Sequence, residues 1–228
     1  MAPANAHVPA SARLYNDLRR QIVGLELHPD AMLDRSDLAE KYKVSQSPVR
    51  EAILRLEQDA LVVSYPQSRT LITRIDVSRI REEHFLRVSA ECEVVRQLAE
   101  AADPAVAVKA KGLVRLQEAL VDEVEQADLF KQLDDAFHEA LFAGVDQINL
   151  HRHIVSRSGH LARVRTLDLP KQGKMHAVLT AHKAILEAIE SGDGAKAAAH
   201  MRLHLSGTIE RLADLRAERP EFFAPVAN

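Results

Sequence analysis

The segment from Val44 to Leu56, which reads VSQSPVREAILRL, constrains the fold more than any other stretch of this chain. Its apolar residues recur at the i, i+3, i+4, i+7 spacing of a helix: Val49, Ala52, Ile53 and Leu56. This spacing predicts a helix that buries one face, with Ser45 as N-cap and Pro48 in the first turn, where a missing backbone N–H costs little. The outward side chains crowd its N-terminal end: Ser45, Gln46, Ser47 and Arg50. Such a helix end can dock on phosphates and base edges.

Two further helices are expected before this segment, over residues 11–23 and 36–42. The break between them falls at His28–Pro29–Asp30, and Lys43 with Val44 leaves only a tight connection into the third helix. Three helices with a short turn between the last two form the helix-turn-helix pattern of DNA-binding domains.

Two β-prone runs follow the third helix, over residues 61–65 and 70–73, separated by Pro66 to Arg69. A hairpin directly after a DNA-reading helix is a wing, and its tip can place Arg69 against the duplex. Residues 11–74 are therefore predicted to form a winged helix-turn-helix DNA-binding domain. The alternative is a small α+β domain of another function, because other such domains share this order of elements.

The remaining chain is expected to be helical. Residues 1–10 are small and Pro-rich, and we expect them to form a disordered leader. We expect a linker over residues 75–78, a helical bundle over 79–217 and a C-terminal tail over 218–228. Helix starts are expected at Ser78, Asp103–Pro104, Asp128, around Gln147, Pro170 and Asp193. The second bundle helix is expected to bury Leu113, Leu116 and Leu120. The fold class is thus mostly α: an N-terminal winged helix-turn-helix plus a C-terminal all-α helical bundle.

The composition and charge of the chain narrow the class of protein. Its 228 residues suffice for two domains that each bury a core. A single cysteine, Cys92, excludes an internal disulfide framework, and no apolar run has the length of a membrane span, so we expect a cytoplasmic protein without membrane contact. Residues 11–74 carry 10 Lys and Arg against 9 Asp and Glu, a net charge of +1. Because so small a charge gains little from counterion release, we expect a homodimer with two reading domains on one pseudo-palindromic operator.

Four polar residues occupy bundle positions where apolar ones are expected: Asp134, His138, His182 and His204. Asp134 and His138 are four residues apart and leave one face of one helix, while each of the other two continues the apolar stripe of a later helix. One carboxylate and three imidazoles directed into one bundle form a ligand set suited to Zn, Ni, Mn or Fe. The alternative is that each is a core side chain satisfied by a neighbour, because spacing alone does not prove that three helices converge.

Residues 11–74 resemble the winged helix of the GntR family of bacterial transcriptional regulators. The family pattern S-x-[ST]-P-V-R-E-A-L-x-x-L is matched by SQSPVREAILRL over residues 45–56, and GLELHPD over residues 24–30 is similar to its G-x-L-x-P-G segment. Gln46 stands where the family often has a basic residue. The resemblance implies contacts to double-stranded operator DNA from Ser45, Gln46, Ser47, Arg50 and Arg69.

Residues 78–215 resemble the FCD ligand-binding domain of the FadR-type branch of this family, which carries D-x-x-x-H on one helix and a His on each of two later helices. The chain matches with DDAFH over residues 134–138, AHKAI over 181–185 and MRLHL over 201–205. The resemblance implies a divalent transition metal held by the four residues named above. Asp135 and His200 are the neighbouring rivals for Asp134 and His204.

Four protein ligands around an octahedral metal leave two positions for water or for a small carboxylate effector. Arginines that could match its free oxygens are Arg87, which begins an R-x-x-x-E pattern with Glu91, and Arg163 and Arg165. For each arginine, a solvated or salt-bridged role is an equal alternative.

We expect a ligand-responsive DNA-binding transcriptional regulator that senses a small organic acid at a metal site. A second hypothesis is a metal-dependent enzyme, because an open His3Asp site can activate water. The chain lacks HExxH, GxSxG and a phosphate-binding Gly-rich loop, which argues against an enzyme, and no catalytic residue is assigned. A third hypothesis is a metal-free effector-binding regulator with structural histidines.

Overall fold

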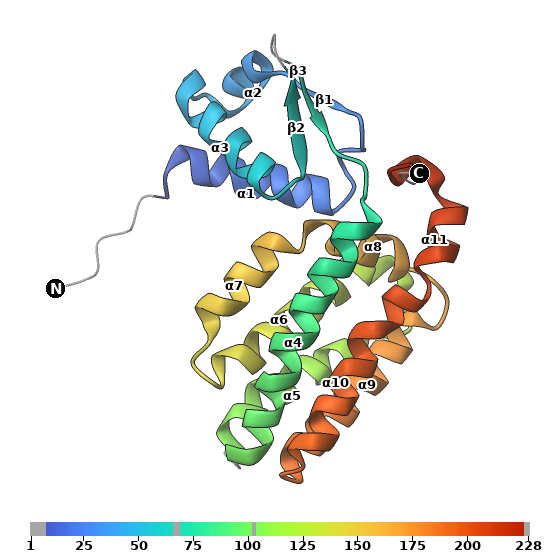
Figure 1. Ribbon diagram of the computed structural model, residues 1–228. Coiled ribbons are helices and arrows are strands. Elements are labelled where there is room, and N and C mark those ends of the chain that lie inside the picture. Colours follow the sequence, from blue (N-terminus) through green and yellow to red (C-terminus); the bar gives the residue numbers. More distant parts are fainter. Residues whose placement is uncertain (1–7, 66–68, 102–103, 226–228) are drawn as a thin grey trace, which may run out of the picture. The chain divides into compact units, whose positions relative to one another are not determined.

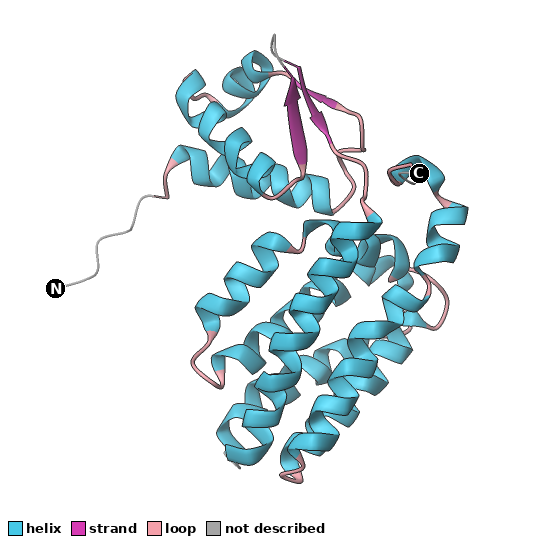
Figure 2. Ribbon diagram, in the orientation of Figure 1, coloured by secondary structure: helices cyan, strands magenta, loops and turns pink. Residues whose placement is uncertain are grey.

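The chain folds into two compact units. The computed structural model describes residues 8–65, 69–101 and 104–225. One unit is formed by Met1–Asp76 together with Glu221–Asn228, and the other by Val77–Pro220 (Figure 1). Helices dominate, and the strands of the described residues are confined to the N-terminal unit (Figure 2). The expected fold class is therefore confirmed.

The described part of the N-terminal unit contains three helices and a three-stranded antiparallel sheet. Its elements are α1 (Ala10–Val23), β1 (Met32–Leu33), α2 (Arg35–Tyr42), α3 (Gln46–Gln58), β2 (Val62–Tyr65) and β3 (Arg69–Ile72). β3 lies between the other two strands, and its pairing with β2 runs from Val62↔Ile72 to Tyr65↔Arg69. The expected helices and hairpin are present. The sequence pattern missed β1 because two residues are too few for an alternation to be visible.

Local side chains and backbone shape the turn between α2 and α3. Asp34 accepts hydrogen bonds from the backbone N–H groups of Ser36 and Asp37 and thereby caps α2. Lys43 ends α2 with a φ of 52°, in the left-handed region, which redirects the chain into α3. Ser45 occupies the N-cap position of α3 as expected, but its side chain makes no capping hydrogen bond.

An apolar core joins the three helices to the sheet. The four residues of the predicted stripe on α3 are at most 1% exposed: Val49, Ala52, Ile53 and Leu56. They pack in one cluster with Leu14, Leu18 and Ile22 of α1 and with Ile72 of β3. The core therefore holds α3 by one face and leaves its other face in solvent.

The described part of the C-terminal unit is helical throughout. Its elements are α4 (Val77–Ala101), α5 (Pro104–Leu120), η1 (Val124–Gln126), α6 (Ala127–Ala143), α7 (Ile148–Arg157), α8 (Gly159–Asp168), α9 (Lys174–Glu190), α10 (Gly194–Glu210) and α11 (Leu212–Glu218). The short turn η2 (Pro220–Phe222) follows where the chain passes back to the N-terminal unit. α10 packs along both α4 and α9, and α5 packs along α6 (Figure 1). None of the helices in the described ranges is long and apolar enough to cross a membrane.

Five of the six expected helix starts lie within one residue of an observed start, and the sixth, Pro170, is wrong. α9 begins only after Gly173, whose φ of 74° sets the preceding turn, and α8 was not expected as a separate helix. The first turn of α8 is capped from afar, because Glu83 on α4 accepts from the backbone N–H groups of His160 at 3.3 Å and Leu161 at 2.7 Å. A cap supplied from 77 residues away leaves no local pattern to read.

The expected core-facing stripe of α5, Leu113, Leu116 and Leu120, is confirmed only in part, because Leu113 and Leu120 are partly buried and pack against the core. Leu116 is 55% exposed, which places it on the outer face of the helix. The fully buried positions follow a neighbouring line: Ala110, Val114 and Gln117 on α5, and Val121 directly after it. The polar Gln117, which is 0% exposed, hid this stripe from the pattern.

The last described residues of the chain pack on the N-terminal unit. Phe223 forms a parallel bridge with Ile75. The backbone N–H of Ile75 donates to the Phe222 carbonyl, and that of Ala224 donates to the Ile75 carbonyl, both at 2.8 Å. The Phe222 ring lies 5.3 Å from that of His28 between centroids, and both phenylalanines are 2% exposed. A short C-terminal segment is therefore part of the N-terminal unit.

These observations differ from the expected boundaries at both ends of the N-terminal domain. The expected tail, residues 218–228, includes the packed segment just described, because its two aromatic side chains bury apolar surface. The expected linker, residues 75–78, shortens to two residues, since α4 begins at Val77. The expected leader, residues 1–10, falls mostly outside the described residues, and α1 already begins at Ala10.

Candidate metal centre and DNA-contacting helix

The four expected metal ligands come from three helices that meet in the core of the C-terminal unit. Asp134 and His138 lie one turn apart on α6, His182 lies on α9 and His204 on α10. Phe137 stacks on the His182 ring with a centroid distance of 3.9 Å, which fixes the orientation of that imidazole. Helix packing, which spacing could not reveal, brings these side chains together.

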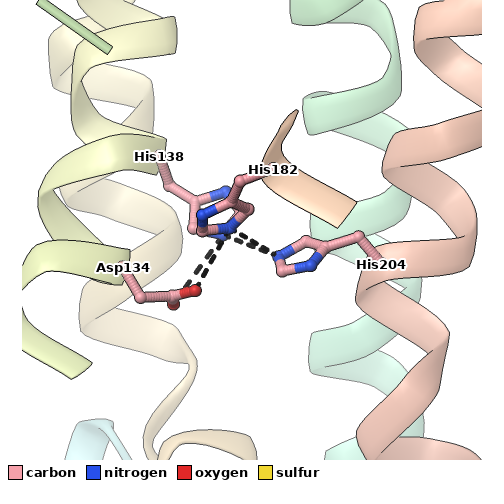
Figure 3. Close-up of side chains that lie close together, drawn as sticks. All are labelled: Asp134, His138, His182 and His204. Carbon is pink, nitrogen blue, oxygen red and sulfur yellow. Dashed lines mark hydrogen bonds and ion pairs between the residues drawn. The ribbon is translucent and has the colours of Figure 1, made fainter. Parts of the chain in front are cut away.

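One potential ligand atom from each residue lies within 4.8 Å of those of the other three (Figure 3). His204 Nε2 lies 3.2 Å from His138 Nε2 and 3.3 Å from His182 Nε2. The Asp134 carboxylate oxygens lie 3.3 Å from His182 Nε2 and 3.8 Å from His138 Nε2. Neither rival, Asp135 nor His200, belongs to this cluster within the described part of the chain.

Burial and neighbouring charges set the protonation of these groups. Burial lowers the pKa of His182 and lowers that of His204 well below its usual value, so both rings are neutral near pH 7. Burial alone would raise the pKa of Asp134, but Arg165 and the imidazoles outweigh it and hold that pKa well below its usual range. Arg165 pairs with Asp134 and lies 3.1 Å from Asp135. The cluster therefore presents an ionised carboxylate and imidazole lone pairs, as divalent first-row metals require.

Two buried side chains contact the second ring nitrogens of the imidazoles. His138 Nδ1 lies 2.6 Å from Glu91 Oε2, and Glu91 Oε1 accepts from Arg87 at 2.6 Å. His182 Nδ1 lies 2.8 Å from Gln117 Oε1. Glu91 is 3% exposed and Gln117 is 0% exposed, so water does not compete for these contacts.

A cavity reaches Asp134 and His204 from one side of the cluster. Its wall carries five basic side chains: His84, Arg87, Lys131, Arg165 and Lys174. Both arginines and Lys174 pair with carboxylates of the protein. Lys131 instead donates to the Thr166 hydroxyl at 2.6 Å, and burial lowers its pKa to about 8. A basic wall beside a metal-ligand cluster is suited to a small anion.

The three arginines expected to bind an effector lie in two different places. Arg87 and Arg165 line the cavity. Arg163 is 0% exposed and lies outside that lining, with its Nη2 3.0 Å from His160 Nδ1. Burial lowers the pKa of Arg163 to about 10, against the attraction of Glu83. The structure therefore does not bring Arg163 to the cavity.

The residues expected to contact DNA are exposed on the N-terminal unit. One group gathers at the start of α3: Ser45, Gln46, Ser47 and Arg50. The Ser45 hydroxyl is not committed to capping, as noted above. Arg69 opens β3 opposite Tyr65, at the end of the hairpin, and the intervening residues 66–68 lie outside the described ranges.

Sequence reasoning missed Gln117 and Lys131 and noted Glu91 only for its spacing from Arg87. A signal existed for Lys131, which lies three residues before Asp134 and so shares its helix face. For Gln117, the signal was its helical spacing from Ala110 and Val114, which are buried on the same face of α5. Neither signal could identify a partner on another helix.

Two family models match this chain. The model for "Bacterial regulatory proteins, gntR family" matches residues 10–72, and the model for the "FCD domain" matches residues 83–207. The first covers the winged helix, and the second spans all four expected metal ligands.

Full-length relatives belong to the same class. An HTH-type transcriptional regulator in an unstable DNA locus of Streptomyces ambofaciens is 33% identical over 212 residues, which are 92% of this chain and 88% of that one. The HTH-type transcriptional repressor RspR of Escherichia coli K12 is 27% identical over 220 residues, 96% of each chain. Both relatives carry the names of transcriptional regulators, and these names and the family models indicate a regulator and not the metal-dependent enzyme.

Solved structures share the architecture. E. coli McbR/YncC matches with a TM-score of 0.73 at 18% identity, over 92% of this chain and 99% of its own. A GntR regulator from Rhodococcus sp. RHA1 matches with a TM-score of 0.69 at 22% identity, over 89% and 97%. At these identities the likeness shows the fold alone. The family matches and the 33% identical relative together show that this chain belongs to the GntR family of bacterial transcriptional regulators and carries an FCD domain.

Proposed function

We propose that this protein is a homodimeric regulator in which a divalent metal, held by one carboxylate and three imidazoles, forms part of the binding site for a small carboxylate effector. The proposed ligands are Asp134, His138, His182 and His204. The observation that carries the proposal is the convergence of their ligand atoms within 4.8 Å, in the domain joined to a GntR reading domain.

The spacing of the donor atoms fits a metal. Donor atoms bound to one first-row metal at about 2.0–2.2 Å lie about 3–4 Å apart. His204 Nε2 lies 3.2 and 3.3 Å from the other two Nε2 atoms, and Asp134 lies 3.3 Å from His182 Nε2. Three nitrogens and a carboxylate oxygen suit Zn, Ni, Mn or Fe. A bound metal supplies a Lewis-acid position for an oxygen ligand.

The cavity supports a carboxylate as that oxygen ligand. Arg87 and Arg165 are already paired with carboxylates of the protein. Lys131 has no carboxylate within ion-pair distance among the described residues, so an incoming anion would compensate its buried charge. It lies one helical turn before Asp134, which places an anion near the metal within reach of its ammonium group.

The reading domain supports binding to operator DNA through the exposed start of α3 and the wing. Ser45, Gln46, Ser47 and Arg50 enter the major groove, and Arg69 contacts the backbone or the adjacent groove. A second copy supplies the affinity that a reading domain of net charge +1 lacks. The effector acts by binding the DNA-competent and DNA-incompetent arrangements of the dimer with different affinities.

The DNA contacts are tested by selecting sites from a random-sequence library and measuring affinity by fluorescence anisotropy. Arg50→Ala is expected to weaken binding by about 1–3 kcal/mol, and Gln46→Arg is expected to change the preferred half-site. Arg202→Ala, an exposed arginine on α10, is the matched control and leaves binding unchanged. Failure of the wild-type protein to enrich any paired half-site would refute the proposal.

The metal is tested by elemental analysis of protein purified without added metal. One first-row metal per chain is expected, and chelation followed by re-addition should remove and restore it. A metal-free protein that also takes up none of the four candidate metals would favour a regulator with structural histidines.

A further inference from the structure

We propose that Gln117 and Glu91 are positioning residues, which hold the rings of His182 and His138 with their Nε2 lone pairs directed at the metal position. This inference rests on the metal site proposed above, and it concerns residues that do not themselves bind the ion. It derives from the hydrogen-bonding capacity of each partner.

Glu91 sets the tautomer of His138. The Glu91 carboxylate is 3% exposed: its Oε1 accepts from Arg87 at 2.6 Å, and its Oε2 lies 2.6 Å from His138 Nδ1, an ion-pair contact without regular hydrogen-bond geometry. An ionised carboxylate only accepts hydrogen bonds, so the His138 nitrogen facing it must carry a proton. A neutral imidazole has one N–H, and therefore Nε2 of His138 is left as a lone pair.

Gln117 plays the same part for His182 without a charge. Its Oε1 lies 2.8 Å from His182 Nδ1 and can accept the Nδ1 proton, whereas in the metal-free protein the Asp134 carboxylate is a rival acceptor 3.3 Å from His182 Nε2. When Nε2 binds a metal, the ring proton must lie on Nδ1, where Gln117 accepts it. The other amide atom of Gln117, Nε2, is buried and has no hydrogen-bond partner among the described residues. Burying a donor without a partner is unfavourable, so an apolar residue would pack better at this position. What the amide of Gln117 provides, and an apolar side chain could not, is an acceptor for the Nδ1 proton of His182.

His204 completes the division of roles. Its Nε2 lies 3.2 Å from His138 Nε2 and 3.3 Å from His182 Nε2, so the three Nε2 atoms face one point between the helices. A metal at that point needs the Nε2 lone pair of each ring, and Glu91 and Gln117 favour that tautomer in two of the three rings. Ligand groups oriented by outer partners bind metals more tightly because less reorganisation is needed.

The proposal is tested by measuring Zn affinity in the full chain by competition with a chromophoric chelator. Gln117→Met removes the acceptor at similar volume and is expected to weaken Zn binding about 10- to 100-fold. Gln117→Glu keeps an acceptor on His182 and is expected to restore affinity close to wild type. Glu118→Met, at the adjacent exposed position on α5, is the matched control. Equal Zn affinity in Gln117→Met and wild type would overturn the role of Gln117.

A second readout needs no variants. Nitrogen-15 NMR of the wild-type protein reports which ring nitrogen carries the proton in each histidine. In the metal-free protein, a proton on Nδ1 of His138 supports the role of Glu91, and a proton on its Nε2 overturns that role. In the Zn-loaded protein, a proton on Nδ1 of His182 supports the role of Gln117, and Zn bound through Nδ1 overturns it. If wild-type protein binds no Zn, the metal proposal and the role of Gln117 both fail, while the metal-free measurement still decides the role of Glu91.

Discussion

The two units of this protein bury different kinds of side chain. Among the described residues of the N-terminal unit, the buried polar ones are Ser11 and Thr70, which carry no charge. The C-terminal unit buries six charged residues and three histidines: Glu83, Arg87, Glu91, Asp134, Arg163, Asp168, His138, His160 and His182. Buried charges contribute little net stability, because desolvation offsets their attraction. One core is thus organised to hold a surface helix in place, and the other to hold ligand groups inside.

The comparison predicts that changes in the two cores have separate consequences. A truncation in the N-terminal core should cost folding free energy and leave the metal site intact. A change among the buried charged residues and histidines of the C-terminal unit should weaken metal or effector binding more than it destabilises the fold. These side chains contact one another and the proposed ligand, and they add little to apolar packing.

The largest expected effect is loss of the metal from His182→Ala. Removing one of the four ligands should reduce the bound metal from about one ion per chain to nearly none, as measured by elemental analysis after both proteins are dialysed in the same way. His200→Ala is the matched control and should retain the metal, because His200 lies outside the cluster. Unchanged metal content in His182→Ala would show that the ion binds elsewhere.

The second prediction concerns the core of the N-terminal unit. Phe222 is 2% exposed and packs near His28, so Phe222→Ala should destabilise the reading domain by about 3–5 kcal/mol. Hydrogen–deuterium exchange of α1 to α3 measures this loss, and Zn affinity should stay constant. Phe85→Ala, at a phenylalanine that is 74% exposed, is the control and should have little effect. Equal protection in both variants would mean that the C-terminal segment adds no stability.

A third change separates effector binding from metal binding. Lys131→Met removes the cavity cation that lacks a carboxylate partner among the described residues, and it should weaken binding of an effector carboxylate by about 1.5–3 kcal/mol. Calorimetry with a panel of small hydroxycarboxylates, run on metal-loaded protein, measures this loss. Lys109→Met, at an exposed position of α5, is the control. An unchanged affinity would place the effector away from Lys131.

The smallest expected effect is the response of the metal-free C-terminal unit to acid. Burial lowers the pKa of His182 and His204, so below about pH 6.5 the unfolded chain binds protons that the folded unit does not. The stability that these neutral histidines contribute is therefore full above that pH and falls as the pH decreases below it. Burial raises the pKa of Glu83 to about 7, so this carboxyl takes up a proton first in the folded state and opposes the loss.

Removing the opposing group should make the acid loss visible. Glu83→Gln keeps an acceptor for the first turn of α8 and should lose more stability than wild type between about pH 7.5 and about pH 5.5 in urea titrations. Glu82→Gln, an exposed neighbour, should behave as wild type. Identical slopes in wild type and Glu83→Gln would show that Glu83 stays ionised over this range.

Much of the architecture was readable from local patterns. The apolar spacing of Val49, Ala52, Ile53 and Leu56 predicted a buried face of α3, and five helix starts in the second half followed from cap and first-turn residues. Such patterns succeed where burial is one-sided and the capping groups are neighbours in sequence. They failed for α8, whose cap comes from Glu83, and on α5 they misplaced Leu116 and missed the buried Gln117.

The sequence by itself determined the two-part organisation, the reading helix and the identity of the four residues that could bind a metal. Only the tertiary structure decided that their ligand atoms meet and that Glu91 and Gln117 contact the second ring nitrogens of two of the histidines. It also decided that Lys131 and not Arg163 lines the cavity, and that the chain's C-terminal segment packs beside Ile75. The physical reason is range. Helical periodicity acts between residues a few positions apart, whereas each of these contacts joins side chains from elements that are distant in sequence and adjacent only after packing.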